Sequence, residues 1–152
     1  MRRATSLHRS GDWPAEQAQA SITLAWADRH RRRLAVTDDS GGDFLLDLPE
    51  ASLLADGDGL CLSDGGWIVV RAAEEAVADI ECDDAETLVR IAWHIGNRHA
   101  AVQILAGGGL RIHDDHVLIA MIEGLGGRIL RHLAAFHAEN GAYAQGGHNH
   151  HI

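Results

Sequence analysis

The fold is decided by residues 76–97, which have the sequence AVADIECDDAETLVRIAWHIGN. The alternating apolar residues of Ala76–Cys82 predict a strand. Asp83 or Asp84 can then cap a helix that runs from Ala85 to about Asn97, because a carboxylate there accepts hydrogen bonds from the first backbone N–H groups of the helix. The apolar face of this predicted helix carries Leu88, Ile91, Ala92 and Ile95.

The residues that follow complete a pattern of alternating elements. Val102–Leu105 and Leu110–Ile112 flank three glycines, which predicts a hairpin. A second helix is predicted from about Asp115 to Leu125, where two glycines end it, and Ile129–Leu133 follows as a strand. The order strand, helix, strand, strand, helix, strand is that of a ferredoxin-like domain, which we assign to residues 74–137.

The first half of the chain has a different pattern, that of short strands separated by turns rich in Asp and Gly. This pattern predicts a small antiparallel β domain over residues 1–73, a barrel or sandwich that can serve to dock partners. The basic run Arg29–Arg33 is interpreted mainly as a solvated hairpin turn, and secondarily as a docking patch. The expected strands are Ser21–Ala25, Leu34–Thr37, Phe44–Leu48, Gly59–Leu62 and Trp67–Arg71. The fold class is therefore α+β, with a flexible, histidine-containing tail at residues 138–152.

Composition and charge exclude several classes of function. The 152 residues carry a formal net charge of −9 with histidine counted neutral. This balance argues against nucleic acid as a partner, because phosphate binding needs a concentrated basic surface. No run approaches the roughly 18 apolar residues of a transmembrane helix, and no apolar stretch follows Met1-Arg2-Arg3 as it would in a signal peptide. We therefore expect a cytoplasmic protein that binds neither nucleic acid nor membrane.

The histidines are the candidate chemical groups, and their positions matter more than their number. His148, His150 and His151 end the Gly-rich tail, which indicates a metal-binding arm, because neutral imidazole is a good ligand for nickel, copper and zinc; an indifferent polar end is the competing explanation. His99 lies alone at the end of the first predicted helix. A lone histidine there is usually a cap or an interface residue, but across a two-fold axis two copies could share an ion.

A further group stands at residues 111–116, with the sequence RIHDDH. Helix starts favour acidic residues, so Asp114 and Asp115 have a structural explanation, while His116 beside them also suits metal binding. The two explanations stay open at this point. The group resembles the HxHxDH signature of binuclear metallo-hydrolases with its first histidine replaced by Arg111, so a metal-dependent hydrolase is one alternative. A protein-interaction module with incidental histidines is another.

Three segments together resemble the urease accessory protein UreE family. They are Trp93-His94-Ile95-Gly96-Asn97-Arg98-His99, Val102-Gln103-Ile104, and Asp115-His116-Val117-Leu118 with Met121, followed by Gly141-Ala142-Tyr143 before the tail histidines. The resemblance implies a dimeric, non-enzymatic nickel chaperone with a β domain before a ferredoxin-like domain. It also implies delivery of Ni(II) for assembly of the urease active site, together with an accessory GTPase and an apo-urease accessory complex; Zn(II) or Cu(II) can bind the same ligands in vitro.

The resemblance also implies which residues bind the ion. His99 would bind nickel at the dimer interface together with its symmetry mate, and His148, His150 and His151 would complete that site. Asp115 and His116 match a peripheral site of some members, although Asp114 stands where those members have a histidine. The tail is shorter than in some relatives, so we expect one transferable ion rather than a store.

Overall fold

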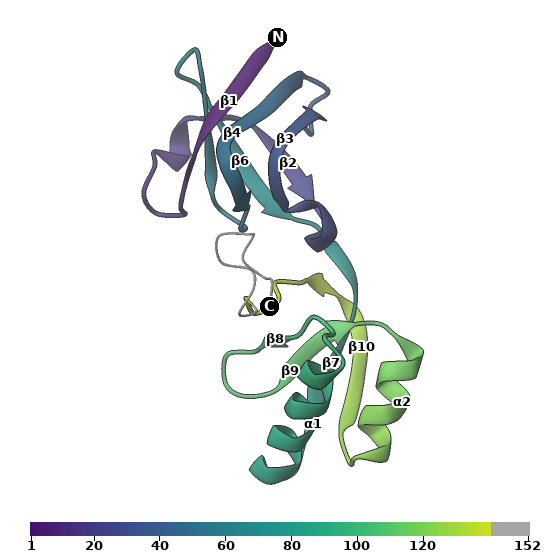
Figure 1. Ribbon diagram of the computed structural model, residues 1–152. Coiled ribbons are helices and arrows are strands. Elements are labelled where there is room, and N and C mark those ends of the chain that lie inside the picture. Colours follow the sequence, from purple (N-terminus) through teal and green to yellow (C-terminus); the bar gives the residue numbers. More distant parts are fainter. Residues whose placement is uncertain (141–152) are drawn as a thin grey trace. The chain divides into compact units, whose positions relative to one another are not determined.

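The computed structural model describes residues 1–140, and these form two compact units that meet in sequence between Ala73 and Glu74. Each unit is described by itself, and Figure 1 shows the ribbon of both. None of the helices in the described part of the chain is long and apolar enough to cross a membrane.

The first unit is a curled sheet of six strands, with short 3-10 helices at Ala15–Gln17 and Trp26–Asp28. The strands are β1 (Arg2–His8), β2 (Ala18–Leu24), β3 (His30–Thr37), β4 (Asp43–Leu53), β5 (Gly59–Leu62) and β6 (Trp67–Ala72). Their order across the sheet is β2-β6-β5-β1-β4-β3. The N-terminal β domain is confirmed, but its sheet is mixed rather than wholly antiparallel, because β1 pairs with β4 and β2 with β6 in parallel.

Alternation along the strands explains where the core of this unit lies. In β4 the buried side chains Phe44, Leu46 and Leu48 alternate with more exposed neighbours, as expected for a strand with one face toward the core. They pack with buried residues of the other strands, among them Ile22, Leu60 and Ile68.

The prediction for the basic run was wrong, and one strand of the first unit was missed. The basic run is not a turn: Arg29 is buried at the end of the second 3-10 helix, and the residues after it form β3. Strand β1 was not predicted, because Arg2–His8 is polar, and it is a strand only through its long-range pairing with β4 and β5.

The second unit has the predicted βαββαβ order and is ferredoxin-like. Its elements are β7 (Glu74–Glu81), α1 (Ala85–Asn97), β8 (Gln103–Ile104), β9 (Leu110–His113), α2 (His116–Gly124) and β10 (Arg128–Ala135). The sheet order is β10-β7-β9-β8, and every pairing is antiparallel. Both helices lie on one face of this sheet (Figure 1).

The predicted start and apolar face of α1 explain how it packs. The carboxylate of Asp84 accepts a hydrogen bond from the Thr87 backbone N–H at 2.7 Å, so Asp84 is the cap. Ile91 and Ile95 are then fully buried against sheet residues such as Ile80 and Ile112. Because Ile95 is buried, the C-terminal end of α1 is held in place. His99, the candidate metal ligand, lies just beyond this end.

Candidate metal-binding site

The end of α1 is closed by a regular hydrogen-bonded motif. The Ala100 N–H donates to the Ile95 carbonyl at 3.2 Å, and the His99 N–H donates to the Gly96 carbonyl at 2.9 Å. These are the two bonds of a Schellman motif, and Ala100 also packs against the core cluster that contains Ile95, as the motif requires. The backbone at His99 is therefore held by the helix before it and by the packing after it.

His99 occupies the position in this motif that glycine usually takes. Its φ is 57°, and it is the one non-glycine residue with a positive φ among residues 1–140. An L-residue in this conformation costs about 1–2 kcal/mol, although histidine tolerates it better than most residues. The side chain is exposed, so packing does not explain the choice of residue. Such an outlier at a fixed, exposed point is a reason to suspect that the imidazole itself has a function.

The solvent-facing side of α1 carries an apolar stripe. Val89 and Trp93, four residues apart, are 67% and 62% exposed. The Trp93 ring makes an edge contact with the half-buried His94, with centroids 5.0 Å apart. Two large apolar side chains in line on a helix form a patch suited to a protein contact.

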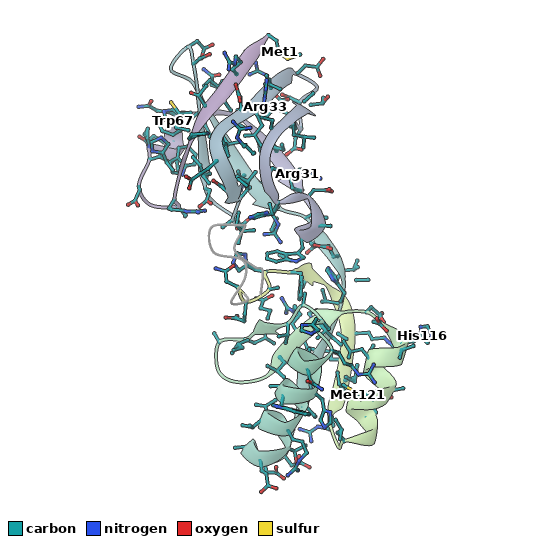
Figure 2. All side chains as sticks on the ribbon, in the orientation of Figure 1. Met1, Arg31, Arg33, Trp67, His116 and Met121 are labelled. Atoms are coloured by element: carbon teal, nitrogen blue, oxygen red, sulfur yellow. The ribbon has the colours of Figure 1, made fainter. Side chains whose placement is uncertain are left out.

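The other predicted ligands are placed as follows. His148, His150 and His151 lie outside the described residues. Asp115 is the N-cap of α2: one of its carboxylate oxygens, Oδ1, accepts from the Val117 and Leu118 N–H groups at 2.9 and 3.1 Å. His116 is the first residue of that helix and is exposed, with its side chain directed away from the sheet in Figure 2. Asp114 contacts Arg131 at 3.3 Å.

The described residues do not assemble a complete metal site. No group of three or more His, Cys, Asp or Glu side chains within residues 1–140 is arranged to hold an ion. Neither His99 nor His116 therefore belongs to a group of three such side chains in the described part of its own chain. A site at His99 therefore needs ligands from a second subunit, from the tail, or from both.

The face of the second sheet that the helices leave uncovered holds an ionic network that the sequence did not reveal. Arg111 donates two hydrogen bonds to Asp79, at 2.7 and 3.0 Å, and His132 lies 2.8 Å from the same carboxylate. Burial raises the pKa of Asp79, but the hydrogen bonds from Arg111 and His132 outweigh it and hold that pKa below its usual value. His113 similarly lies 2.9 Å from Glu75. Arg111 and His113 thus have protein partners on β7.

The chain beyond β10 is bound to β8, which begins four residues after His99. The Glu139 N–H donates to the Val102 carbonyl at 2.8 Å, and a carboxylate oxygen of Glu139 accepts from the Ile104 N–H at 3.1 Å. The His137 N–H donates to the side-chain oxygen of Gln103 at 2.9 Å. The sequence gives no sign of these contacts, since they join residues more than thirty positions apart.

Comparison with known proteins places this architecture in a known class. The profile described as "UreE urease accessory protein, N-terminal domain" matches residues 2–73, and that described as "UreE urease accessory protein, C-terminal domain" matches residues 75–152. The two-domain arrangement is thus that of a urease accessory protein.

Full-length relatives agree with these matches. The chain is 49% identical over 150 residues to urease accessory protein UreE of Bradyrhizobium sp. (strain ORS 278). The aligned residues are 99% of this chain and 70% of the relative. It is 45% identical over 154 residues to the UreE of Chelativorans sp. (strain BNC1), covering 99% and 94%, respectively. The UreE of Agrobacterium fabrum is 42% identical over 151 residues, covering 99% and 92%.

The chain belongs to the UreE urease accessory protein family. This family has a role in urease maturation, handles nickel and is non-catalytic. The alternative of a metal-dependent hydrolase is therefore wrong, and the RIHDDH segment that suggested it is a strand end followed by a helix cap.

Proposed function

We propose that this protein is a nickel metallochaperone that binds one Ni(II) between two subunits and delivers it to apo-urease. The observation that carries the proposal is the left-handed conformation of His99, 57° in φ, at an exposed and rigidly held helix end. The cost of this conformation is accounted for if the imidazole binds an ion. His99 of each subunit would supply one ligand, and His148, His150 and His151 would complete the coordination.

A dimer with two-fold symmetry explains both the apolar stripe and the incomplete site. In such a dimer the same patch on each subunit meets its own copy. If the patch is that of Val89 and Trp93, α1 of one subunit packs against α1 of its partner near the axis. If the two-fold axis also passes beside the C-terminal ends of the two helices, the two His99 side chains are brought toward each other. The dimer thus supplies a second ligand that one chain lacks.

The chemistry of the ligands suits transport rather than permanent binding. Imidazoles bind divalent ions only when neutral, and tail ligands can detach without any part of the fold opening. Affinity alone would favour Cu(II) over Ni(II), and Zn(II) also binds imidazole. We infer that nickel is selected in the cell by its availability and by contact with the partner that receives it. Asp115 and His116 form at most an additional, weaker site, because the cap already uses one Asp115 oxygen.

We propose that the first unit docks the accessory GTPase or the apo-urease accessory complex, in the cytoplasm. Strand β3 is at the edge of its sheet and carries Arg31 and Arg33 (labelled in Figure 2), which form ion pairs with Asp28 and Asp47. Arginines on an edge strand also prevent strands of other molecules from pairing there. Replacing Arg31 and Arg33 by Glu, with Arg71→Glu as control, should reduce capture of the purified GTPase if they dock it.

The experiment that tests nickel binding compares four chains: the wild type, His99→Ala, a chain ending at Gly147, and His30→Ala. His30 is an exposed histidine of the first unit and serves as the control. We expect a dimer that binds one Ni(II) per two chains, loss of this binding in His99→Ala, and weaker binding in the shortened chain. Unchanged binding in His99→Ala would place the ion elsewhere. If binding is lost but urease is still activated, the protein is an interaction module with incidental histidines.

A further inference from the structure

The two helices of the second unit end in the same hydrogen-bonded motif but with different residues. At the end of α2 the Gly127 N–H donates to the Ile122 carbonyl at 3.0 Å. The Gly126 N–H donates to the Glu123 carbonyl at 3.1 Å. Gly126 has a φ of 105°, so glycine stands at the position where the left-handed backbone favours it. The end of α1 instead has His99 at that position, with a φ of 57°.

Glycine stands in α1 at a different position, Gly96, in the last turn of the helix. Gly96 does not have a positive φ, and no atom outside the adjoining helix lies within 4 Å of the place where its Cβ would be. The corresponding position in α2 is Glu123. Glycine in a helix is generally less favourable than alanine. Alanine would therefore fit at position 96 and stabilise the single chain, so the described residues give no structural reason for glycine there.

Gly96 belongs to the exposed apolar stripe of α1. It follows Val89 and Trp93 at a spacing of four and then three residues, which places all three on one face of the helix. Gly96 is itself exposed. The distance between two packed helices depends on the side chains at their contact, and glycine has none to hold the two backbones apart. The stripe thus offers large apolar side chains for burial and, beside them, a point where a second helix can approach closely.

The charges along α1 indicate that the approaching helix is a second copy of α1. The start of the helix is acidic, with the exposed residues Asp84 and Glu86. Residues 87–113 contain no acidic residue, and Arg90 and Arg98 are exposed there. Two copies that run antiparallel across a two-fold axis direct the acidic start of each helix toward the basic end of the other, and the two helix dipoles also attract in this arrangement. This local complementarity matters because each chain has a formal net charge of −9, so two copies otherwise repel.

The position of His99 indicates where two such helices must cross. Along the helix direction, Trp93 is about 9 Å and Gly96 about 4.5 Å from His99. An antiparallel pair that crosses at Trp93 therefore leaves the two His99 residues about 18 Å apart along the helices, whereas a crossing at Gly96 leaves them about 9 Å apart. A histidine side chain and its bond to an ion together span about 6 Å. Two of them reach across the shorter distance and not across the longer one.

We propose that Gly96 is the point of closest approach between the α1 helices of two subunits, and that its lack of a side chain lets the two His99 imidazoles share one Ni(II). This inference rests on the proposed dimer and its shared ion. It accounts for both differences from the end of α2. Histidine at the left-handed position supplies the ligand, and glycine about one helical turn earlier supplies the room for the partner helix.

The test compares the wild type, Gly96→Ala, Gly96→Gln and Gly124→Ala in the full chain. Sedimentation equilibrium with a chelator gives the Kd of the dimer, and titration gives the affinity for Ni(II). Gly124 is the matched control, because it is an exposed glycine in the last turn of α2, also with no atom within 4 Å of its Cβ position. We expect Gly96→Ala to raise the dimer Kd about tenfold, because an overfilled contact is destabilising. Gly96→Gln should raise it further, Gly124→Ala should leave it unchanged, and nickel affinity should fall in the same order.

A second measurement separates a weaker dimer from a damaged fold. At a chain concentration below the dimer Kd, Gly96→Ala should have a Tm roughly 1–3 °C above that of the wild type, because alanine favours the helix. A lower Tm would give Gly96 a role within its own chain and overturn the proposal.

The remaining outcomes distinguish this inference from the proposed function. If both Gly96 variants dimerise as the wild type does while His99→Ala loses nickel, the shared ion stands and the crossing at Gly96 is wrong. If Gly96→Ala weakens the dimer but the wild type binds no nickel, the close contact stands and the nickel function fails. A wild type that is monomeric both with and without Ni(II) would overturn the two together.

Discussion

Replacing His99 by glycine separates the function of the side chain from its conformational cost. At His99 the backbone has a φ of 57° in a Schellman motif. Glycine adopts this conformation without strain, so His99→Gly should strengthen the fold and abolish the proposed nickel binding.

The size of the effect follows from two opposing terms. Relief of the left-handed strain contributes about 1–2 kcal/mol, and the greater freedom of glycine in the unfolded chain removes about 0.4–1 kcal/mol. The net gain in the free energy of unfolding is about 0–1.6 kcal/mol, and its central value of about 0.8 kcal/mol raises Tm by roughly 2–3 °C. Alanine in the same left-handed conformation is strained as well, and it tolerates this conformation less well than histidine. His99→Ala should therefore be no more stable than the wild type.

The assay is thermal and urea unfolding of the wild type, His99→Gly and His99→Ala at one protein concentration in the presence of a chelator. The chelator is needed because bound metal would itself stabilise the wild type, and a fixed concentration is needed if the protein is a dimer. Nickel titration of the same three proteins completes the comparison. Equal stability of the Gly and Ala variants would refute the strain argument. Wild-type nickel affinity in His99→Gly would refute the role of the imidazole.

Three further predictions follow from the structure. Hydrogen bonds from the Gly42 N–H, Ser40 and Arg2 hold the pKa of Asp38 well below its usual value. Asp38→Asn should therefore be less stable than the wild type at pH 7. The difference in stability should shrink as the pH falls below about 3.9, which is the pKa of Asp in the unfolded chain. Asp115→Ala should lower the free energy of unfolding by about 1 kcal/mol and Asp115→Asn by little, since Asn is an equally good cap; a marked loss of nickel in Asp115→Asn would show that the carboxylate is a ligand. Nickel affinity should be lower at pH 5.5 than at pH 7.5, because imidazoles bind divalent ions only when neutral, and equal affinities at the two pH values would exclude imidazole ligands.

Local signals were sufficient to predict most of the second unit. The helix cap, the apolar spacing of Ile91 and Ile95, and the glycines after α2 each act within a few residues. The spacing and the glycines were found where expected, and of the two candidate caps, Asp83 and Asp84, the structure uses Asp84. Parallel pairing is different, because it joins segments distant in sequence. The register of Arg2 opposite Phe44 spans more than forty residues, so neither β1 nor the mixed character of the first sheet could be seen in the local pattern.

The sequence suggests which residues could form the candidate site, and this stays a prediction, but it does not indicate the backbone conformation at His99. His99 was expected at a helix end, yet its left-handed backbone follows from how Ile95 and Ala100 close the helix. The prediction of a turn at the basic run was wrong for a related reason. Arg31–Arg33 form an edge strand only because they pair with β4. The contacts of Glu139 with Val102 and Ile104 are also long-range, so no local sequence pattern predicts them.

The left-handed backbone conformation of His99 also restricts which side chains, and so which metal-ligating atoms, can stand at the end of α1. Apart from glycine, the residues that accept this conformation at low cost are Asn, Asp and His. Asn and Asp offer oxygen, which suits magnesium, calcium and manganese, and only His offers the nitrogen that nickel, copper and zinc prefer. Cysteine, glutamate and methionine would each bear the full conformational cost. If His99 binds an ion as proposed, its backbone conformation therefore favours a metal that prefers nitrogen or oxygen ligands, and a site for a metal that prefers sulfur would require a different helix end as well as a different side chain.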